Sequence, residues 1–337
     1  MEAGVQKANG AGGAGSYLYV EVDYTASGSS ASPSVSPSVS PSVSPSSSVS
    51  PSVSVSPSTS PSVSPSVSPS PSVGSYCYYK EIIIDHTKVE GTGDLSNFPV
   101  LISHTDANLK TVSNGGRVED AQGDDIIFAL PDGTVLAHEV ELYVPTTGQI
   151  IAHVNVPTVD GDANTTIRIY YGGTTITTSQ QNAAGTWNSA YKGVWHMSQD
   201  PSGSSPQILD STSNDYDMTA AGTMTSGDLV TGQINKAIEF DGSDDELKNT
   251  AWSSVISGNG ARTIESWFNI ASTPNANWIS WGAAAGNELS SMGCYANDIG
   301  FLGYANDNLT SGAPYDDGLW HHMVITHDGS TMKVLID

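Results

Sequence analysis

The chain has 337 residues, of which 35 are acidic and 11 basic, giving a net charge of -24 and a pI near 4.3. Nucleic acids and anionic membranes are bound through basic patches, so this charge balance argues against both as partners. No apolar run approaches the roughly 20 residues of a membrane helix, so we expect no membrane insertion within this chain.

The first 25 residues contain one strand-like stretch, Ser16–Thr25. Leu18, Val20 and Val22 fall on one face of it and polar or aromatic residues on the other, which is the pattern of a half-buried strand. A single strand is not stable alone, so we interpret residues 1–25 as the remnant strand of an upstream domain. No signal-peptide pattern is visible at the N-terminus.

Residues 26–75 have the composition of a low-complexity linker. Pro33–Val73 repeats Pro-Ser-Val-Ser with small slips, and no Asp, Glu, Lys or Arg occurs between Ala26 and Ser75. Such a segment has too little apolar surface to offset the entropy of ordering, and regular proline forbids helix and sheet interiors. We predict a disordered or extended stalk, about 120–130 Å long at most, that displays the domains on its C-terminal side.

Residues 76–173 predict a β-sandwich. Alternating or β-branched runs recur with almost no helical period, and Pro131-Asp132-Gly133 supplies a turn. Asp106–Val112 gives the one helical hint, with Asp106 as its cap. The predicted strands are Tyr78–Asp85, Phe98–Ser103, Asp125–Leu130, Val135–Val144, Gln149–Val156 and Thr165–Tyr171.

Five blocks in this region, among them YYKEIIIDHTKVEG, LSNFPVLIS and GDDIIFALPDGTVLAHEVELY, resemble the bacterial domain of unknown function DUF2341. The resemblance covers about Tyr78–Gly173. It implies a β-sandwich on large surface or secreted proteins, and it implies no catalytic residue.

Residues 187–337 resemble the laminin-G-like, concanavalin A-like lectin/glucanase jelly roll. The motifs that carry the resemblance are FDGSDD at Phe240–Asp245 and WHHMVITHDGS at Trp320–Ser330. The family implies a two-sheet sandwich that binds glycans, proteins or calcium. Family members continue with further strands beyond the equivalent of Ile336-Asp337, so we expect this jelly roll to be incomplete at its C-terminal edge.

Three carboxylates in one loop are candidate calcium ligands. Asp241, Asp244 and Asp245 lie within five residues at a strand end, and calcium prefers several hard oxygen ligands. The alternative is that Asp241 makes the turn with Gly242 and the other two are solvated. Asp210, Asp215 and Asp217 form a weaker candidate group.

Aromatic and histidine residues offer two further candidate sites. Trp278 and Trp281 are candidate carbohydrate-binding platforms, although their spacing of three does not place both on one strand face, and core packing is the alternative. Three histidines lie on one predicted strand. His321 and His322 are adjacent, so their side chains point to opposite faces, and His327 lies six residues beyond His321. This spacing favours structural roles over zinc binding.

No enzyme motif is present. A jelly-roll glucanase needs paired carboxylates spaced as E-x-D-x-x-E on one strand face, and this chain has none. Glu139 and Glu141 have a spacing of two, but they lie in the first sandwich, where we expect a solvated strand face. The two cysteines, Cys77 and Cys294, fall in different predicted domains and define no disulfide framework.

The sequence as a whole indicates an all-β protein with two β-sandwich domains after a disordered Ser/Pro-rich stalk. We expect a non-catalytic extracellular or cell-surface module for adhesion or carbohydrate binding, with glycans or surface proteins as partners and calcium as the candidate cofactor. Two alternatives stay open: rigid structural spacers of a surface or phage protein, and an accessory module of a polysaccharide-degrading enzyme.

Overall fold

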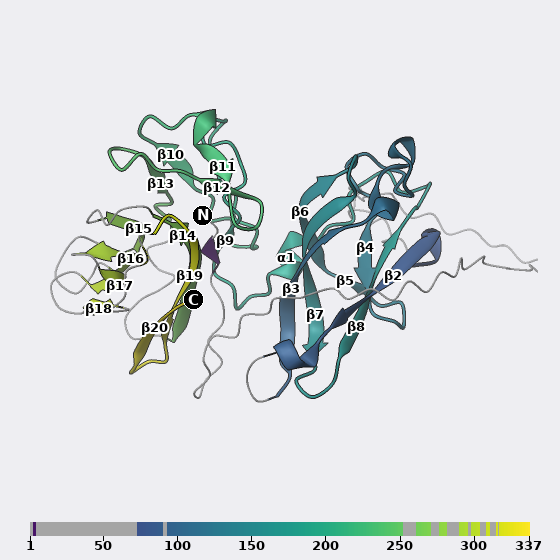
Figure 1. Cartoon of the computed structure of the whole chain (residues 1–337), viewed down its shortest axis with the longest axis horizontal. Helices are drawn as coiled ribbons and strands as arrows, with labels where there is room; N and C mark the ends of the chain where they lie inside the picture. Colours follow the sequence, from purple (N-terminus) through teal and green to yellow (C-terminus); the bar gives the residue numbers. More distant parts are fainter. Residues whose placement is uncertain are drawn as a thin grey trace, which may run out of the picture.

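The computed structural model describes residues 3–4, 73–89, 93–251, 261–270, 276–281, 290–295, 298–303, 308–310, 315 and 317–337. The strand predicted at Ser16–Thr25 and the predicted stalk up to residue 72 lie outside this part of the chain. Two lobes stand side by side, the first built from residues 73–191 and the second from residue 194 onward together with residues 3–4 (Figure 1).

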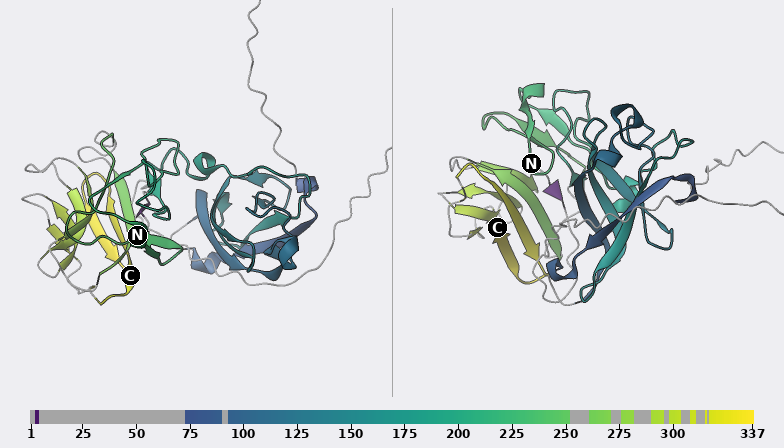
Figure 2. Two further views of the ribbon diagram at one scale, coloured as in Figure 1. Left: turned by 90° about the horizontal axis from the view of Figure 1, so that it is seen from above. Right: turned by 45° about the vertical axis from the view of Figure 1, so that its right-hand side comes forward.

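The first lobe is a sandwich of two antiparallel sheets, whose strands surround a common interior (Figure 2). One sheet has the order β2 (Tyr78–Ile84), β8 (Thr165–Tyr171), β4 (Ile127–Ala129), β5 (Val135–Leu136). The other has the order β3 (Leu95–Thr105), β7 (Gln149–Val159), β6 (His138–Val144). Each strand overlaps one of the predicted runs.

The core of the first lobe is aliphatic. Alternate residues of the facing strands point inward, and the fully buried set includes Ile82, Ile84, Val100, Ile102 and Ile167. Burial of such side chains is worth about 25 cal/mol per Å² of apolar surface, which is the main term that holds the two sheets together.

Turns and short helical segments close the first lobe. The predicted cap at Asp106 is present, since its side chain accepts a hydrogen bond from Asn108 N at 2.7 Å. The segment that it caps is a single 3₁₀ turn, Ala107–Leu109, and not a longer helix. Gly133 has φ of +91°, the left-handed conformation that its predicted turn requires. Val73–Ser75, the end of the predicted linker, form another 3₁₀ turn, and Val73 packs against the lobe. Cys77 is an exposed free thiol.

The outer face of the β7–β6 pair is covered as well as the inner one. The covering element is the connector, residues 174–193, which contains the short helix α1 (Ala183–Thr186). The side chain of Asn155 donates to Thr186 O at 2.9 Å, and Val140 N donates to the side chain of Gln181 at 2.7 Å. Residues Ile150–Val156 are therefore buried on both faces, unlike a strand with one face in water.

The second lobe contains a five-stranded and a four-stranded antiparallel sheet. The five-stranded sheet has the order β20 (Met332–Ile336), β19 (Trp320–His327), β14 (Arg262–Asn269), β1 (Ala3–Gly4), β9 (Val194–Trp195). The four-stranded sheet consists of β15 (Ala276–Trp281), β16 (Ser290–Tyr295), β17 (Asp298–Gly303) and β18 (Asn308–Thr310). Two ribbons complete the lobe, β10 (Thr219–Ala221) with β13 (Glu246–Lys248) and β11 (Leu229–Thr231) with β12 (Lys236–Ile238).

The core of the second lobe lies between its two larger sheets. Ile264, Phe268, Met323 and Ile325 are buried there, on the faces of β14 and β19 that point toward the four-stranded sheet. Asp328-Gly329 makes the hairpin turn between β19 and β20, with Gly329 at φ of +106°. The prediction of an all-β protein with two sandwiches is confirmed.

The burial of His322 predicts that the second lobe is less stable at acidic pH. Burial lowers the pKa of His322 from 6.5 to about 4, although the charge of Asp337 opposes the shift. The Nε2 atom of His322 lies 3.9 Å from the carboxylate of Glu265, and its ring packs 4.9 Å from that of Trp267. As the pH falls below 6.5, His322 takes up a proton in the unfolded chain but not in the folded one. The free energy of unfolding is therefore highest above pH 6.5 and falls between pH 6.5 and about pH 4.

We expect this loss to reach roughly 3 kcal/mol for the second lobe, and His322→Gln to remove it. Denaturant midpoints of the second lobe at pH 7 and pH 4.5 measure the effect, with His327→Gln on the same strand as a control. An unchanged pH dependence in His322→Gln would contradict the prediction.

Candidate functional site

The predicted calcium loop brings its three carboxylates together. One oxygen from each of Asp241, Asp244 and Asp245 lies within 4.8 Å of the others. Asp241 Oδ1 also accepts from Ser243 N at 2.7 Å, so the same residue closes the turn, and this bond holds its pKa below the usual range. Asp245 Oδ1 is buried and accepts no hydrogen bond from the part of the chain that the structure describes. The loop thus supplies hard oxygen ligands, as a calcium site requires.

The second acidic group predicted from the sequence has a structural role. Asp210 is buried, and its carboxylate accepts from the backbone N–H groups of Val194, Thr212 and Tyr216 at 2.9–3.0 Å. Asp217 accepts from the backbone N–H of Asp210 at 2.8 Å. These bonds hold the loop in place. Asp215 is exposed, and within the described residues the three carboxylates do not form a group of close ligand atoms.

The two candidate sugar platforms share strand β15. The register against β16 shifts between Asn277 and Ile279, which makes Trp278 the extra residue of a β-bulge. The Trp278 ring stacks on Phe268 with ring centroids 4.7 Å apart, and its Nε1 donates to Ser266 Oγ at 3.2 Å. Trp278 therefore packs against the core, while the side chain of Trp281 lies outside the described part of the structure.

The three histidines of the second lobe do not converge on one point. His321 Nε2 lies 3.1 Å from Asp317, whereas His322 faces Glu265. His327 Nδ1 accepts from Gly329 N at 3.1 Å within the hairpin turn.

The side chain of Glu141 is buried and that of Glu139 is largely covered, so the expectation of a solvated strand face was wrong. Their side chains are 15% and 1% exposed, because the connector and the second lobe cover this face of β6. Glu139 accepts three hydrogen bonds, from Trp187 Nε1 at 2.6 Å, Ser211 Oγ at 2.6 Å and His196 Nε2 at 3.1 Å.

A pKa shift follows from these contacts. Burial alone would raise the pKa of Glu139, but the hydrogen bonds and the nearby His196 outweigh it and lower the pKa from 4.5 to about 2. Glu139 is therefore an ionised, largely covered carboxylate at neutral pH.

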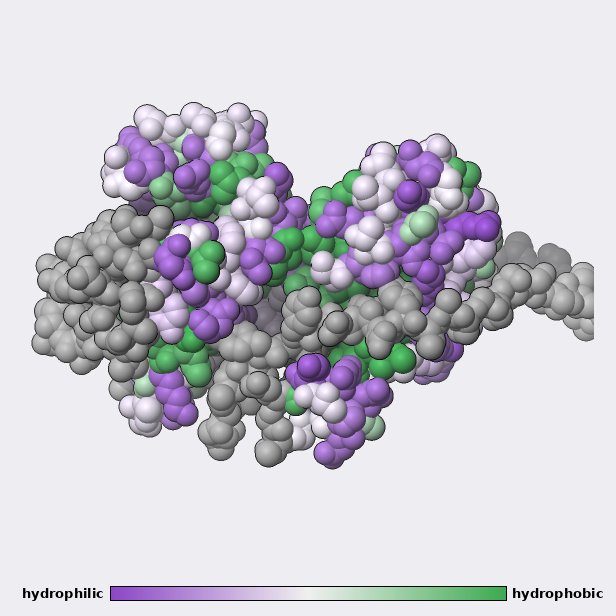
Figure 3. All heavy atoms as spheres, viewed as in Figure 1, coloured by the Kyte–Doolittle hydropathy of each residue, from purple (hydrophilic) through white to green (hydrophobic). Residues whose placement is uncertain are grey.

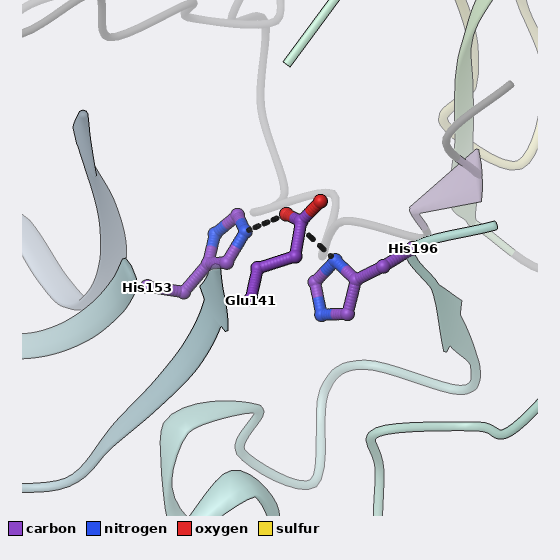
Figure 4. A group of neighbouring side chains, drawn as sticks. All are labelled: Glu141, His153 and His196. Carbon is purple, nitrogen blue, oxygen red and sulfur yellow. Dashed lines mark hydrogen bonds and ion pairs between the residues drawn. The ribbon is translucent and has the colours of Figure 1, made fainter. Parts of the chain in front are cut away.

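Glu141 meets two histidines from different parts of the chain (Figure 4). Its Oε2 lies 3.4 Å from His153 Nε2 and 3.4 Å from His196 Nδ1. His153 is on β7, and His196 follows β9 of the second lobe. The register of β6 against β7 shifts between Val140 and Leu142, so Glu141 is the extra residue of a bulge, a feature that re-aims a side chain.

We call Glu139, Glu141, His153 and His196 the junction cluster. Sequence reasoning missed it because its members lie 12 to 57 residues apart in the pairs that touch. The outer face of β7 gave little signal, because Ile151 is apolar there but its neighbours on that face, His153 and Asn155, are polar.

Two family models match the chain. Residues 122–197 match a family described as a domain of unknown function, DUF2341, and residues 241–337 match the concanavalin A-like lectin/glucanases superfamily. The first match extends through the connector to Met197. Comparisons with curated proteins and with solved structures found no match.

The fold and these matches define a two-domain β protein with a lectin-like or glucanase-like module. The chain carries a DUF2341 domain followed by a laminin-G-like domain of the concanavalin A-like superfamily. Within the described residues, no helix has the length and apolar character needed to cross a membrane.

Proposed function

We propose that the chain is a non-catalytic extracellular or cell-surface module whose concanavalin A-like domain binds carbohydrate. The family match of residues 241–337 carries the proposal. A net charge of -24 suits a soluble, exposed protein and disfavours nucleic acid as a partner. In this proposal residues 26–75 are a linker, 76–173 the first domain and 187–337 the second.

The state of the carboxylates supports binding without catalysis. A glycosidase needs two carboxyl groups that flank a sugar in an open site. Glu139 and Glu141, the only glutamates two residues apart in the sequence, are largely covered by contacts with Trp187 and His196 and, within the described residues, face no open groove that would hold a sugar. The glucanase spacing E-x-D-x-x-E is absent from the sequence.

A glycan array tests the proposal. We expect selective binding to a small set of glycans, weakened at least about tenfold by Trp281→Ala because an aromatic platform is lost. The control is Trp278→Ala, which should lower stability as well, because Trp278 covers Phe268. An array with no selective signal would favour the structural-spacer alternative.

Calcium is the cofactor we propose for the loop of Asp241, Asp244 and Asp245. Binding to the folded state alone stabilises it by RT ln(1 + [L]/Kd), about 2.7 kcal/mol at a hundredfold excess over Kd. We expect calcium to raise the melting temperature of the second domain by a few degrees, and Asp241→Asn with Asp245→Asn to abolish the rise. Equal melting temperatures with and without calcium would rule the site out.

A further inference from the structure

We propose that Glu141, His153 and His196 bind a divalent transition-metal ion at the junction of the two domains, with zinc the ion whose preferences they match best. One ligand atom from each residue lies within 4.8 Å of the others. Imidazole nitrogen and carboxylate oxygen form the donor set that zinc takes in proteins. The family matches assign no metal to these residues.

The two distances from Glu141 Oε2 to the histidine nitrogens fit coordination better than ion pairing. Zinc bonds of about 2.0–2.1 Å at tetrahedral angles place two ligand atoms about 3.3–3.4 Å apart. Glu141 Oε2 lies 3.4 Å from each histidine nitrogen. A charge-assisted hydrogen bond would draw the same atoms to about 2.7–2.9 Å.

The contact with Glu139 sets the tautomer of His196. Carboxylate oxygens accept hydrogen bonds, so in the 3.1 Å contact between His196 Nε2 and Glu139 Oε2 the nitrogen is the donor. With a cation bound, His196 would be neutral, and its Nδ1, 3.4 Å from Glu141 Oε2, would face the ion. A carboxylate that holds one nitrogen of a histidine while the other nitrogen faces the metal is a common arrangement in zinc sites.

Charge and burial also favour a cation. The cluster holds two carboxylates, and the Glu141, His153 and His196 side chains are 1%, 9% and 6% exposed. The rings of His153 and His196 stack with centroids 4.9 Å apart, so two imidazolium ions there would repel each other. One divalent cation balances both carboxylates while both histidines stay neutral.

The ion would join the two domains. Glu141 and His153 belong to the outer face of the first sandwich, whereas His196 follows a strand of the five-stranded sheet of the second. Apolar surface also gathers where the two lobes meet (Figure 3). A metal ion held by both lobes would fix their relative orientation, which suits a module that presents a binding domain at a distance from its anchor.

Zinc chloride added to the chelator-treated full chain tests the proposal, with bound zinc measured by mass spectrometry after dialysis and affinity by titration. We expect one tightly bound zinc per chain. Glu141→Gln, His153→Gln and His196→Gln should each weaken binding by at least about a hundredfold, since each removes a direct ligand and loss of an outer partner alone costs 10–100-fold. Cobalt should give the visible absorption of a tetrahedral site, lost in the same variants.

Matched controls separate this site from ordinary surface residues. Glu81→Gln and His86→Gln remove an exposed carboxylate and an exposed imidazole of the first domain, and both should leave zinc binding unchanged. Asp241→Asn tests the calcium loop and should also have no effect. If the unaltered chain takes up no zinc, or if zinc binds equally well to the three ligand variants, the proposal is overturned and the cluster is a network of ion pairs alone.

Discussion

Asp125→Ala is expected to destabilise the first domain by about 3–5 kcal/mol. Asp125 is fully buried, and its carboxylate accepts hydrogen bonds of 2.9–3.1 Å from four backbone N–H groups, those of Glu119, Asp120, Gly172 and Gly173. Alanine would leave these donors without their acceptor, in a domain whose net stability is of the order of 5–15 kcal/mol.

Hydrogen exchange at the amides of β2 and β8 measures this loss locally, beside the denaturant midpoint. Asp124→Ala is the matched control. Partial burial, and then the charges of Asp120 and Asp125, raise the pKa of Asp124, so its removal relieves repulsion. Exchange in Asp125→Ala equal to that of the unaltered chain would show that the loop does not depend on this carboxylate.

Phe268→Ala is expected to cost the second domain about 3–5 kcal/mol. Phe268 is fully buried between the two larger sheets, where its ring stacks on Trp278 at 4.7 Å and lies 5.8 Å from His321. Removal of the ring leaves a cavity and exposes one face of Trp278.

The second domain of Phe268→Ala should melt far below that of the unaltered chain or be unfolded at 25 °C, with the first domain unchanged. Phe268→Leu keeps most of the apolar volume and should lose less. A loss under about 1 kcal/mol for the alanine variant would contradict this prediction, because it would mean that the core collapses around the gap.

The sequence predicted the strands well because their signals are local. Thr165–Tyr171 is a strand with the predicted ends, and the turns at Gly133 and Gly329 follow from residues that accept positive φ. The helix predicted after Asp106 forms only as a single 3₁₀ turn, although its cap is in place. Too few residues follow the cap to sustain an α-helix, whose first turn is costly to form.

The junction cluster could not be predicted, because it depends on tertiary contacts. In the sequence, Glu139 and Glu141 have the pattern of a solvent-facing strand. In the structure, the connector and the second lobe cover that face. The bulge at Glu141 further breaks the alternation, so that Val140 and Tyr143 both pack against the core. Neither the covering of this face nor the bulge can be recognised from the periodicity of the strand sequence.

The central claim, binding without turnover, is tested most directly by co-sedimentation of the full chain with an insoluble polysaccharide that contains an array-selected glycan. Bound protein and released reducing ends are measured in the same tube, with calcium present. We expect the protein to sediment with the polysaccharide while reducing ends stay at the level of the protein-free control. A steady rise of reducing ends, lost when a carboxylate of the second domain is replaced, would contradict the account.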